Sequence, residues 1–338
     1  MAEAALEGVT KRFGATVAVD SLSLAVADGE FIVLLGPTGA GKTTTLRLFA
    51  GLERPDAGEV RIAGSTVTSL APADRDVAFV FQQYSLYPHY SVFDNLAFPL
   101  RAPGRKGRAA DTRARVEEVA AMLRIEGKLA NKATELSGGE MQRVSIGRAL
   151  VREPNLFLMD EPLSSLDAKL REDLRVELKR VQRDLNATIV YVTHDQLEAM
   201  TLADRIGILE EGRLVQLAAP RVVYEAPATI TAAQRLGSPQ INLVPLGALG
   251  LGVAPHGAVQ AGVRPEDIAV AEGGVAANVI NVEHLGADTV ALLHVEGREV
   301  HVLVDPETPL TEGSATHIAV REGAALWFDA EARLISQH

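Results

Sequence analysis

The stretch FIVLLGPTGAGKTT, residues 31–44, decides the fold of this 338-residue chain. Its first five residues are all apolar, as in a strand buried on both faces, and a helical pattern begins near Thr44. Between them, GPTGAGKTT (Gly36–Thr44) satisfies G-x-x-x-x-G-K-[ST] in the strand–loop–helix context that a phosphate-binding loop requires. The alternative is an accidental glycine-rich turn, which this context disfavours.

The loop predicts how a nucleoside triphosphate would be held. Its glycines allow backbone N–H groups to point into a concave nest around a β-phosphate. Lys42 would span the β- and γ-phosphates, and the hydroxyl group of Thr43 would ligate Mg²⁺. The expected nucleotide-binding residues are Gly36, Pro37, Thr38, Gly39, Ala40, Gly41, Lys42, Thr43 and Thr44.

Polar residues also end other strand patterns. LFLMDEP (residues 156–162) supplies Asp160 as the carboxylate on the Mg²⁺ side and Glu161 to polarise a water molecule; alone, these acids would indicate only a solvated loop. His194 ends TIVYVTH, where a structural histidine is the alternative to a γ-phosphate ligand. Gln82 gives the weakest signal, because glutamine is common at strand ends.

A second candidate anion site is LSGGEMQR, residues 136–143. A Ser-Gly-Gly turn runs into a helical pattern, and the N-terminus of a helix favours negative charge. Other helical patterns cover residues 111–123 and 168–185. Antiparallel strands are expected within residues 3–26, and hairpins are expected to turn at Gly64 and at Glu211-Gly212.

Composition excludes several classes of function. The chain has no cysteine, which excludes disulfides, thiolate metal sites and cysteine nucleophiles. No apolar run approaches the length of a membrane span, and the N-terminus lacks the layout of a signal peptide. We therefore expect a soluble chain, which is still able to dock on a membrane protein.

The net charge of −11 is distributed unevenly along the chain. Residues 239–338 hold 13 acidic and 4 basic residues, a net charge of −9, which leaves −2 for residues 1–238. The change coincides with GSPQINLVPLGALGLGVAPHG, a stretch typical of a domain junction. Before it, alternating strands and helices predict a mainly parallel sheet with helices on both faces; after it, short β runs predict a small barrel or sandwich.

Five motifs in this order resemble those of the ATP-binding cassette (ABC) ATPases: GPTGAGKTT, FQQYSLYPH, LSGGEMQR, FLMDEPLSSLD and YVTHDQLEAMTLADRI. With their spacing they cover residues 3–235. FLMDEPLSSLDAKLR, GSPQIN and GVRPEDI are similar, more narrowly, to the maltose-type ATPase subunits that import carbohydrates. The resemblance implies an α/β nucleotide-binding domain (1–238) with an antiparallel β subdomain and a helical subdomain (about 84–152), followed by an all-β OB-like regulatory domain (239–338).

The resemblance also implies residue roles with ATP and Mg²⁺. Phe13 would stack on adenine, from a loop before the first strands, and Gln82 would reach Mg²⁺ and the attacking water. Asp160 would hold Mg²⁺, Glu161 would act as general base, and His194 would clamp the γ-phosphate. These residues are Phe13, Gln82, Asp160, Glu161 and His194.

Further implied contacts lie between chains. LSGGE would face the γ-phosphate bound by an opposite subunit, so that two chains enclose two ATP molecules; the residues acting in trans would be Ser137, Gly138, Gly139, Glu140 and Asp167. YSLYPH would contact the membrane partner through Tyr84, Leu86, Tyr87 and His89. The implied partners are a second ATPase subunit (the same or a different chain), two transmembrane permeases and, indirectly, a periplasmic or extracellular solute-binding protein. The implied location is peripheral, on the cytoplasmic face of the bacterial inner membrane.

Two departures from the family pattern stand near LSGG. Glu140 replaces the common glutamine, and Asn131–Ala133 (NKA) replaces an Arg-Lys-Pro run. A carboxylate near a triphosphate weakens binding unless it points along the helix or pairs with a base such as Arg143. Our hypothesis is that this half-site is electrostatically weak and pairs with a different ATPase subunit.

Alternative functions remain open at this point. Importers for polyamine, sulfate or iron have similar cassettes, whereas soluble ABC ATPases of DNA repair or translation usually carry large insertions or tandem cassettes. A metabolic P-loop kinase would not need LSGG. Nucleic-acid binding by the tail is opposed by its net charge of −9 and by its having only Trp327 and Phe328 as aromatic residues.

Overall fold

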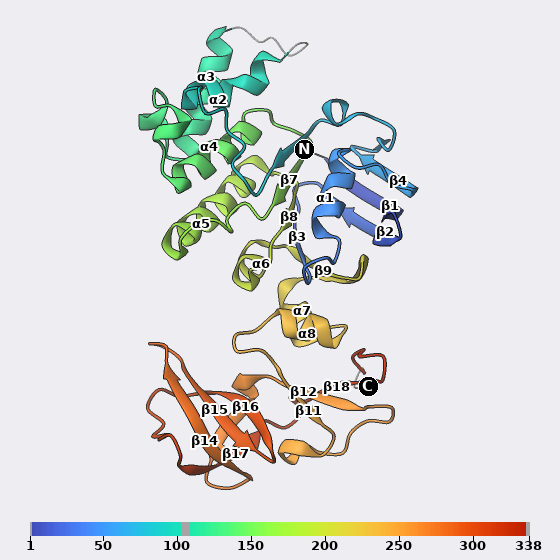
Figure 1. Ribbon diagram of the computed structural model, residues 1–338, viewed down its shortest axis with the longest axis vertical. Coiled ribbons are helices and arrows are strands. Elements are labelled where there is room, and N and C mark those ends of the chain that lie inside the picture. The colour runs from blue at the N-terminus through green and yellow to red at the C-terminus, as the bar shows by residue number, and fades with distance from the viewer. Residues whose placement is uncertain (1, 103–108, 336–338) are drawn as a thin grey trace. The chain divides into compact units, whose positions relative to one another are not determined.

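The computed structural model describes residues 2–102 and 109–335. The chain forms two compact units, Met1–Pro220 and Arg221–His338 (Figure 1). The units divide near two short helices that no sequence pattern above predicted, α7 (Pro220–Glu225) and α8 (Ile230–Arg235). The boundary expected after residue 238 stays a prediction.

A six-stranded sheet forms the centre of the N-terminal unit, in the order β10-β9-β3-β8-β7-β6. All neighbouring pairs are parallel except the β9–β10 hairpin. Because both faces are covered, the central strands are continuous apolar runs. The strands are β3 (Phe31–Leu35), β6 (Val77–Val80), β7 (Leu156–Asp160), β8 (Ile189–Val192), β9 (Arg205–Glu210) and β10 (Arg213–Ala218).

The topology of this sheet gathers the candidate site. The phosphate loop follows β3, Asp160 ends β7, and Gln82 and His194 follow β6 and β8. These four strands are neighbours and run in parallel, so their carboxyl ends meet at one edge of the sheet. Ligands of open α/β sheets bind at that edge. Strand β8 stops at Val192, so His194 lies in the following turn and does not end the strand as expected.

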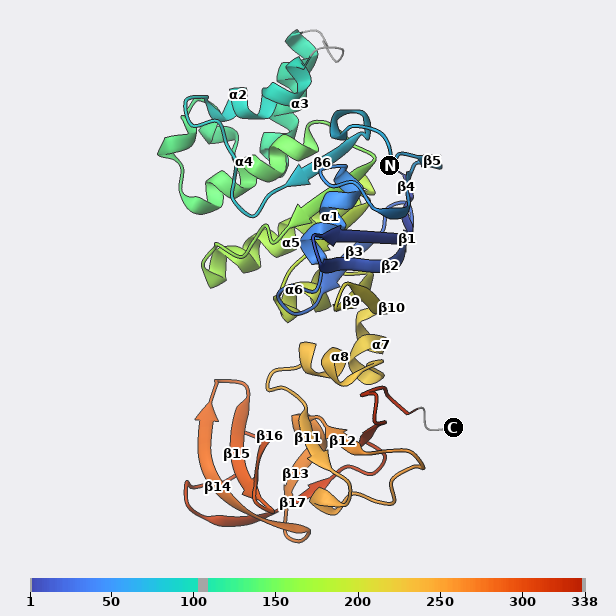
Figure 2. The same cartoon turned by 45° about the vertical axis from the view of Figure 1, so that its right-hand side comes forward.

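A second, antiparallel sheet has the order β2-β1-β4-β5. Helix α1 (Lys42–Ala50) contacts β2 of this sheet and β6, β7 and β8 of the parallel sheet, so it packs between the two (Figure 2). Its apolar face, which includes Leu46 and Phe49, is fully buried in the shared core. The strands are β1 (Ala4–Phe13), β2 (Thr16–Val26), β4 (Ala57–Ile62) and β5 (Ser65–Thr66).

Helices α2 (Val92–Ala97), α3 (Ala109–Met122) and α4 (Gly138–Leu150) pack against one another and form the helical part of the unit. In both views they gather on one side of the parallel sheet (Figures 1 and 2). Helices α5 (Ala168–Leu185) and α6 (Gln196–Leu202) follow β7 and β8. The mainly parallel sheet with an antiparallel β part and a helical part confirms the predicted fold class.

The C-terminal unit is built from two antiparallel sheets, in the orders β11-β12-β18 and β13-β17-β14-β15-β16. Alternating valine, leucine and alanine side chains of these strands fill a core of its own. This curled β structure confirms the predicted OB-like class. The strands are β11 (Asn242–Pro245), β12 (Gln260–Val263), β13 (Ile268–Ala271), β14 (Val275–His284), β15 (Thr289–Val295), β16 (Arg298–Val304), β17 (Ala315–Val320) and β18 (Leu326–Phe328).

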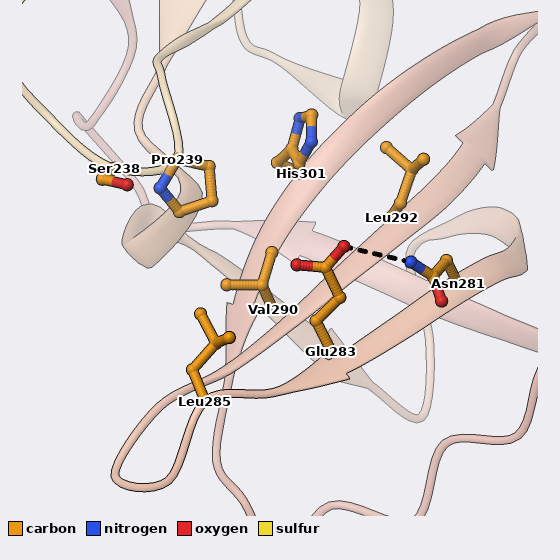
Figure 3. A pocket seen from close by; sticks show the side chains of 8 residues that line it. All are labelled: Ser238, Pro239, Asn281, Glu283, Leu285, Val290, Leu292 and His301. Carbon is orange, nitrogen blue, oxygen red and sulfur yellow. Dashed lines mark hydrogen bonds between the residues drawn. The ribbon is translucent and has the colours of Figure 1, made fainter.

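The C-terminal unit also has a pocket of about 280 Å³ (Figure 3). Strand pairing aligns Asn281, Leu292 and His301 across β14, β15 and β16. The Asn281 amide donates to Glu283 at 3.2 Å, which orients that carboxylate. The remaining lining residues are Ser238, Pro239, Leu285 and Val290.

Among the helices within the described residues, none combines the length and the apolar character needed to cross a membrane.

Candidate nucleotide site

The phosphate loop joins β3 to α1, and close backbone contacts require two of its glycines. A Cβ atom on Gly36 would lie 2.4 Å from the carbonyl oxygen of Leu209 on β9. A Cβ atom on Gly41 would lie 2.4 Å from the carbonyl oxygen of Ala18 on β2, and Gly41 has a φ of +97°. The loop is therefore fixed between both sheets at the N-terminus of α1, which is a favourable position for an anion.

Lys42 begins α1, and its side chain folds back over the loop. Its Nζ donates to the carbonyl oxygens of Gly36 (2.9 Å) and Pro37 (3.0 Å). The residue is only 9% exposed, so its amino group is held within the curve of the loop.

Thr43 and Asp160 meet although 117 residues separate them. The Thr43 hydroxyl group donates to Asp160 Oδ1 at 3.0 Å, which joins the first turn of α1 to the end of β7. Burial raises the pKa of Asp160, and the Thr43 hydrogen bond partly opposes that effect. A hydroxyl oxygen beside a carboxylate is the donor set that Mg²⁺ uses together with nucleotide phosphates.

Glu161 has an unusual backbone conformation, with a φ of +45°. Its N–H donates to the Val192 carbonyl on β8 at 2.9 Å, and its carbonyl accepts the Ser164 hydroxyl at 2.9 Å. Non-glycine residues with positive φ concentrate at functional sites, because the surrounding structure must stabilise them. No sequence signal showed this strain.

The side chains of Gln82 and His194 both contact Glu161. Gln82 Nε2 donates to Glu161 Oε2 at 3.3 Å, and His194 Nδ1 lies 3.2 Å from the same oxygen. The imidazole is 66% exposed, so the cluster opens to solvent. The structure thus brings together the three residues that were expected to be catalytic.

The start of α4 uses Ser137 and Glu140 as a capping box. The Glu140 N–H donates to Ser137 Oγ at 3.4 Å, and Glu140 Oε2 accepts from the N–H (2.9 Å) and the hydroxyl (3.0 Å) of Ser137. Glu140 therefore lies along the helix start, one of the two arrangements considered above.

The base that pairs with Glu140 is Lys128, with Nζ 3.0 Å from Oε1. The sequence had suggested Arg143, but Arg143 Nε lies 3.6 Å from Glu177 on α5. The backbone N–H of Ser137 and the Lys128 ammonium hold the pKa of Glu140 below its usual range. The suggestion of Arg143 was wrong because helix packing turns that side chain toward α5.

The starts of α4 and α5 touch. A Cβ atom on Gly139 would lie 2.1 Å from the Leu170 side chain of α5, so any larger residue would have to displace that side chain. Asp167 caps α5 by accepting the Leu170 N–H at 3.0 Å. Gly139 and Asp167 were expected to act on the nucleotide of an opposite subunit. Within this chain they also form the contact between the starts of α4 and α5.

Arg171 is a structural hub that the sequence did not single out. Its guanidinium donates to the carbonyl oxygens of Leu163 (3.3 Å), Ser164 (3.5 Å) and Leu166 (2.9 Å). It also lies 3.4 Å from Asp195, the N-cap of α6. Its position four residues after Asp167 was the only signal in the sequence.

The segment expected to contact a membrane partner is divided in the structure. Tyr87 lines a pocket of about 490 Å³ whose other walls include Phe79, Phe98, Pro99 and Arg148. His89 is exposed and Leu86 is half-buried. Tyr84 is directed to another part of the same chain, with its hydroxyl 3.1 Å from Ser165 Oγ.

Phe13 ends β1 at the turn into β2, rather than standing in a loop before the first strands as expected. The ring is 47% exposed, and the ammonium group of Lys11 lies 5.1 Å from its centre. Strand β2 reaches the phosphate loop at Ala18. The sheet that carries Phe13 therefore contacts the phosphate loop directly.

Sequence comparison agrees with this geometry. The ABC transporter family model matches residues 19–164, and a TOBE domain model matches residues 261–328. The chain is 42% identical to the sn-glycerol-3-phosphate import ATP-binding protein UgpC of Ralstonia nicotianae, over 97% of each protein. This chain belongs to the ATP-binding proteins of ABC transporters. Like the family, it binds ATP and is an ATP hydrolase, as the sequence predicted.

Two other similar proteins are also sn-glycerol-3-phosphate import ATP-binding proteins. The UgpC protein of Chromobacterium violaceum is 44% identical over 100% of this chain and 97% of its own. The UgpC protein of Rhodopseudomonas palustris is 48% identical over 86% of this chain and 82% of its own. The match extends through both units of this ABC protein.

Solved ABC cassettes match the N-terminal unit. A dimeric cassette in a post-hydrolysis state with ADP and Pi superimposes with a TM-score of 0.58 at 33% identity, covering 64% of this chain and 99% of that one. A second dimeric structure of a bacterial ABC transporter cassette gives the same values. These likenesses confirm the predicted ABC fold.

Proposed function

We propose that this ABC protein is the ATP-hydrolysing subunit of a bacterial importer for sn-glycerol-3-phosphate or a closely related carbohydrate-like solute. The import proteins described above, at 42–48% identity, support the importer and narrow the solute class that the sequence suggested. Importers for polyamine, sulfate or iron, and soluble ABC ATPases, are the less favoured alternatives.

The side chains that follow strands β6 and β8 both contact the carboxylate of Glu161, which follows β7. This contact is the observation that supports ATP hydrolysis by the chain. Gln82 and His194 lie 3.3 Å and 3.2 Å from Glu161 Oε2. The neighbouring Asp160 accepts the Thr43 hydroxyl at 3.0 Å. A base, two orienting groups and a metal-type donor pair thus stand beside the phosphate loop.

Each residue has a role in this proposal. Lys42 and the loop amides bind the phosphates, and Glu161 accepts the proton of the attacking water, which Gln82 and His194 orient. Thr43 and Asp160 hold Mg²⁺, which supplies charge neutralisation on the phosphate oxygens when bound. Phe13 stacks on the adenine ring.

A second ATPase subunit, either the same or a different chain, completes the site in this proposal. The dimeric state of the two related cassettes supports it. Ser137, Gly138 and Gly139 begin helix α4 and would face the γ-phosphate of the opposite subunit, with Glu140 nearby and Asp167 at the seam.

Two transmembrane permeases and, through them, a solute-binding protein are the further proposed partners. The pocket beside Tyr87 supports a docking surface for a permease helix, because aromatic and apolar walls alternate there with Arg148 and Arg152. Leu86 and His89 lie in the same segment. Docking there would hold the protein peripherally on the cytoplasmic face of the inner membrane.

Glu161→Gln tests the proposal, because it removes the base while preserving shape. We expect hydrolysis to fall about 100-fold or more, ATP binding to persist, and an ATP-dependent dimer to accumulate in size-exclusion chromatography. In cells that depend on this chain for uptake of sn-glycerol-3-phosphate, uptake stops.

Lys42→Ala is the matched control, since it should abolish ATP binding and therefore the dimer as well. Unchanged turnover in Glu161→Gln would remove Glu161 as the base. Retained ATP affinity in Lys42→Ala would contradict the phosphate-loop assignment. If cells that lack this chain take up sn-glycerol-3-phosphate normally, the proposal that this compound is the imported solute would be wrong.

A further inference from the structure

Tyr84 joins three segments that the sequence assigned to different tasks. Its hydroxyl lies 3.1 Å from Ser165 Oγ in the loop between β7 and α5. A Cβ atom on Gly138, the first residue of α4, would lie 3.2 Å from the same hydroxyl. Tyr84 itself stands two residues after Gln82 and is half-buried. The segment after Gln82 therefore contacts both the start of helix α4 and the β7–α5 loop of the same chain.

The tyrosine side of this contact is anchored by Arg148 on α4. Arg148 donates to the Ser85 carbonyl at 2.7 Å and to the Tyr84 carbonyl at 3.5 Å. Its guanidinium lies 5.6 Å from the centre of the Tyr87 ring. Tyr84 is thus fixed at its backbone by a residue that also lines the pocket beside Tyr87.

The serine side of the contact leads to Glu161. Ser165 follows Ser164, whose hydroxyl donates to the Glu161 carbonyl at 2.9 Å. The Ser164 N–H lies 3.3 Å from the same carbonyl. Because Glu161 has a strained φ of +45°, its geometry depends on these loop contacts. A shift of Ser165 would therefore be passed through the adjacent Ser164 to the backbone of Glu161.

We propose that Tyr84 is a positioning residue for hydrolysis, acting through its hydroxyl contact with Ser165 to hold the loop that fixes Glu161. The proposal rests on the proposed role of Glu161 as general base. In this proposal, Tyr84 connects the pocket beside Tyr87 with the general base Glu161 of the same chain.

Tyr84→Phe removes only the hydroxyl and provides the test on the full-length protein. We expect kcat to fall about fivefold, the factor that corresponds to one net hydrogen bond of about 1 kcal/mol. The Kd for ATP should stay within about twofold of wild type, because Tyr84 lies outside the phosphate loop. This split between kcat and ATP affinity separates positioning from a loss of folded protein.

A double-mutant cycle with Ser165→Ala identifies the partner. Each single substitution should lower kcat to the same extent, and the double substitution should lower it no further, because both remove one contact. Ser165→Thr keeps a hydroxyl and should retain the wild-type rate. Tyr90→Phe is the matched control, since Tyr90 lies in the same segment and its ring packs on Tyr87 and Phe98.

Wild-type kcat in Tyr84→Phe, or losses that multiply in the double variant, would overturn the proposal. Measuring Glu161→Gln in parallel distinguishes the role of Glu161 as general base from the positioning role of Tyr84. If Glu161→Gln abolishes hydrolysis while Tyr84→Phe has no effect, the base assignment stands and the positioning role fails.

Discussion

At the scale of single residues, Glu140 stands where the resemblance to the ABC ATPases implies glutamine. The structure adds two facts to the hypothesis of a weak half-site. Lys128 partly neutralises the carboxylate at 3.0 Å. The Ser137 hydroxyl, which is expected to face a partner's phosphate, donates to Glu140 at 3.0 Å. In the proposed dimer, Glu140 would therefore compete with that phosphate for the donor.

Glu140→Gln should raise ATP-dependent dimerisation and hydrolysis, because it removes a negative charge and a stronger acceptor for Ser137. We expect a gain of about two- to fivefold, consistent with one exposed charge interaction below about 1 kcal/mol. Glu135→Gln is the control, since it removes a nearby charge without contact to Ser137. No gain in rate or ATP affinity, or an equal gain in both variants, would count against the specific role of Glu140.

The same residue gives a pH prediction. The pKa of Glu140 in the folded chain lies below its usual value of 4.5, so its ionised form stabilises the fold above that pH. This contribution is lost as the pH falls through the lower folded value. The difference in melting temperature between wild type and Glu140→Gln should therefore be largest near neutral pH and narrow below about pH 4.5. A difference that is constant with pH would contradict it.

At the scale of elements, the candidate site depends on how helices begin. Ser137, Asp167 and Asp195 are the N-caps of α4, α5 and α6. Each cap lies within one of the motifs that resemble those of the ABC ATPases. Arg171 then ties the loops before α5 and α6 together through the Leu166 carbonyl and Asp195. Each loop is thus attached to the start of a helix by hydrogen bonds.

Arg171→Ala should reduce the free energy of unfolding by about 1–3 kcal/mol, since several backbone carbonyls lose a charged donor. Hydrolysis should fall more than ATP affinity, because the loop beside Glu161 loosens while the phosphate loop is untouched. Urea unfolding and nucleotide titration measure the two effects. Lys169→Ala, an exposed position on the same helix, should change neither; an equal loss there would assign the effect to α5 in general.

At the scale of the whole molecule, each unit has a large hydrophobic core of its own. One lies between the two sheets and α1 of the N-terminal unit, and the other lies between the β sheets of the C-terminal unit. The net negative charge is concentrated in residues 239–338, which hold 13 acidic but only 4 basic residues. The candidate nucleotide site lies in the first unit.

Calorimetry should therefore resolve two unfolding transitions. With Glu161→Gln protein, Mg²⁺ and ATP should raise only the transition of the N-terminal unit, by the equivalent of about 2.7 kcal/mol at a ligand concentration of 100 times Kd. Wild type with EDTA provides the reference. A single transition that moves as a whole would show that the units unfold together.

Much of the fold was predictable from local patterns. The strand of residues 31–35, the helix of residues 168–185 and the hairpin at Glu211-Gly212 all agree with the sequence analysis, because each carries a strong periodicity or turn signal. Helices α7 and α8 were missed, since each has only six residues and little room for a periodic pattern. The partner of Glu140 was wrongly suggested because it lies outside the helix.

The sequence by itself determined the phosphate loop, the order of the motifs and the two types of domain, because these depend on local spacing and composition. Only the tertiary structure decided which side chains meet. Glu161 is brought to Gln82 and His194, and Tyr84 to Ser165, by the parallel order of strands β6, β7 and β8. Contacts between segments some 80 residues apart follow from sheet topology, which no local pattern encodes.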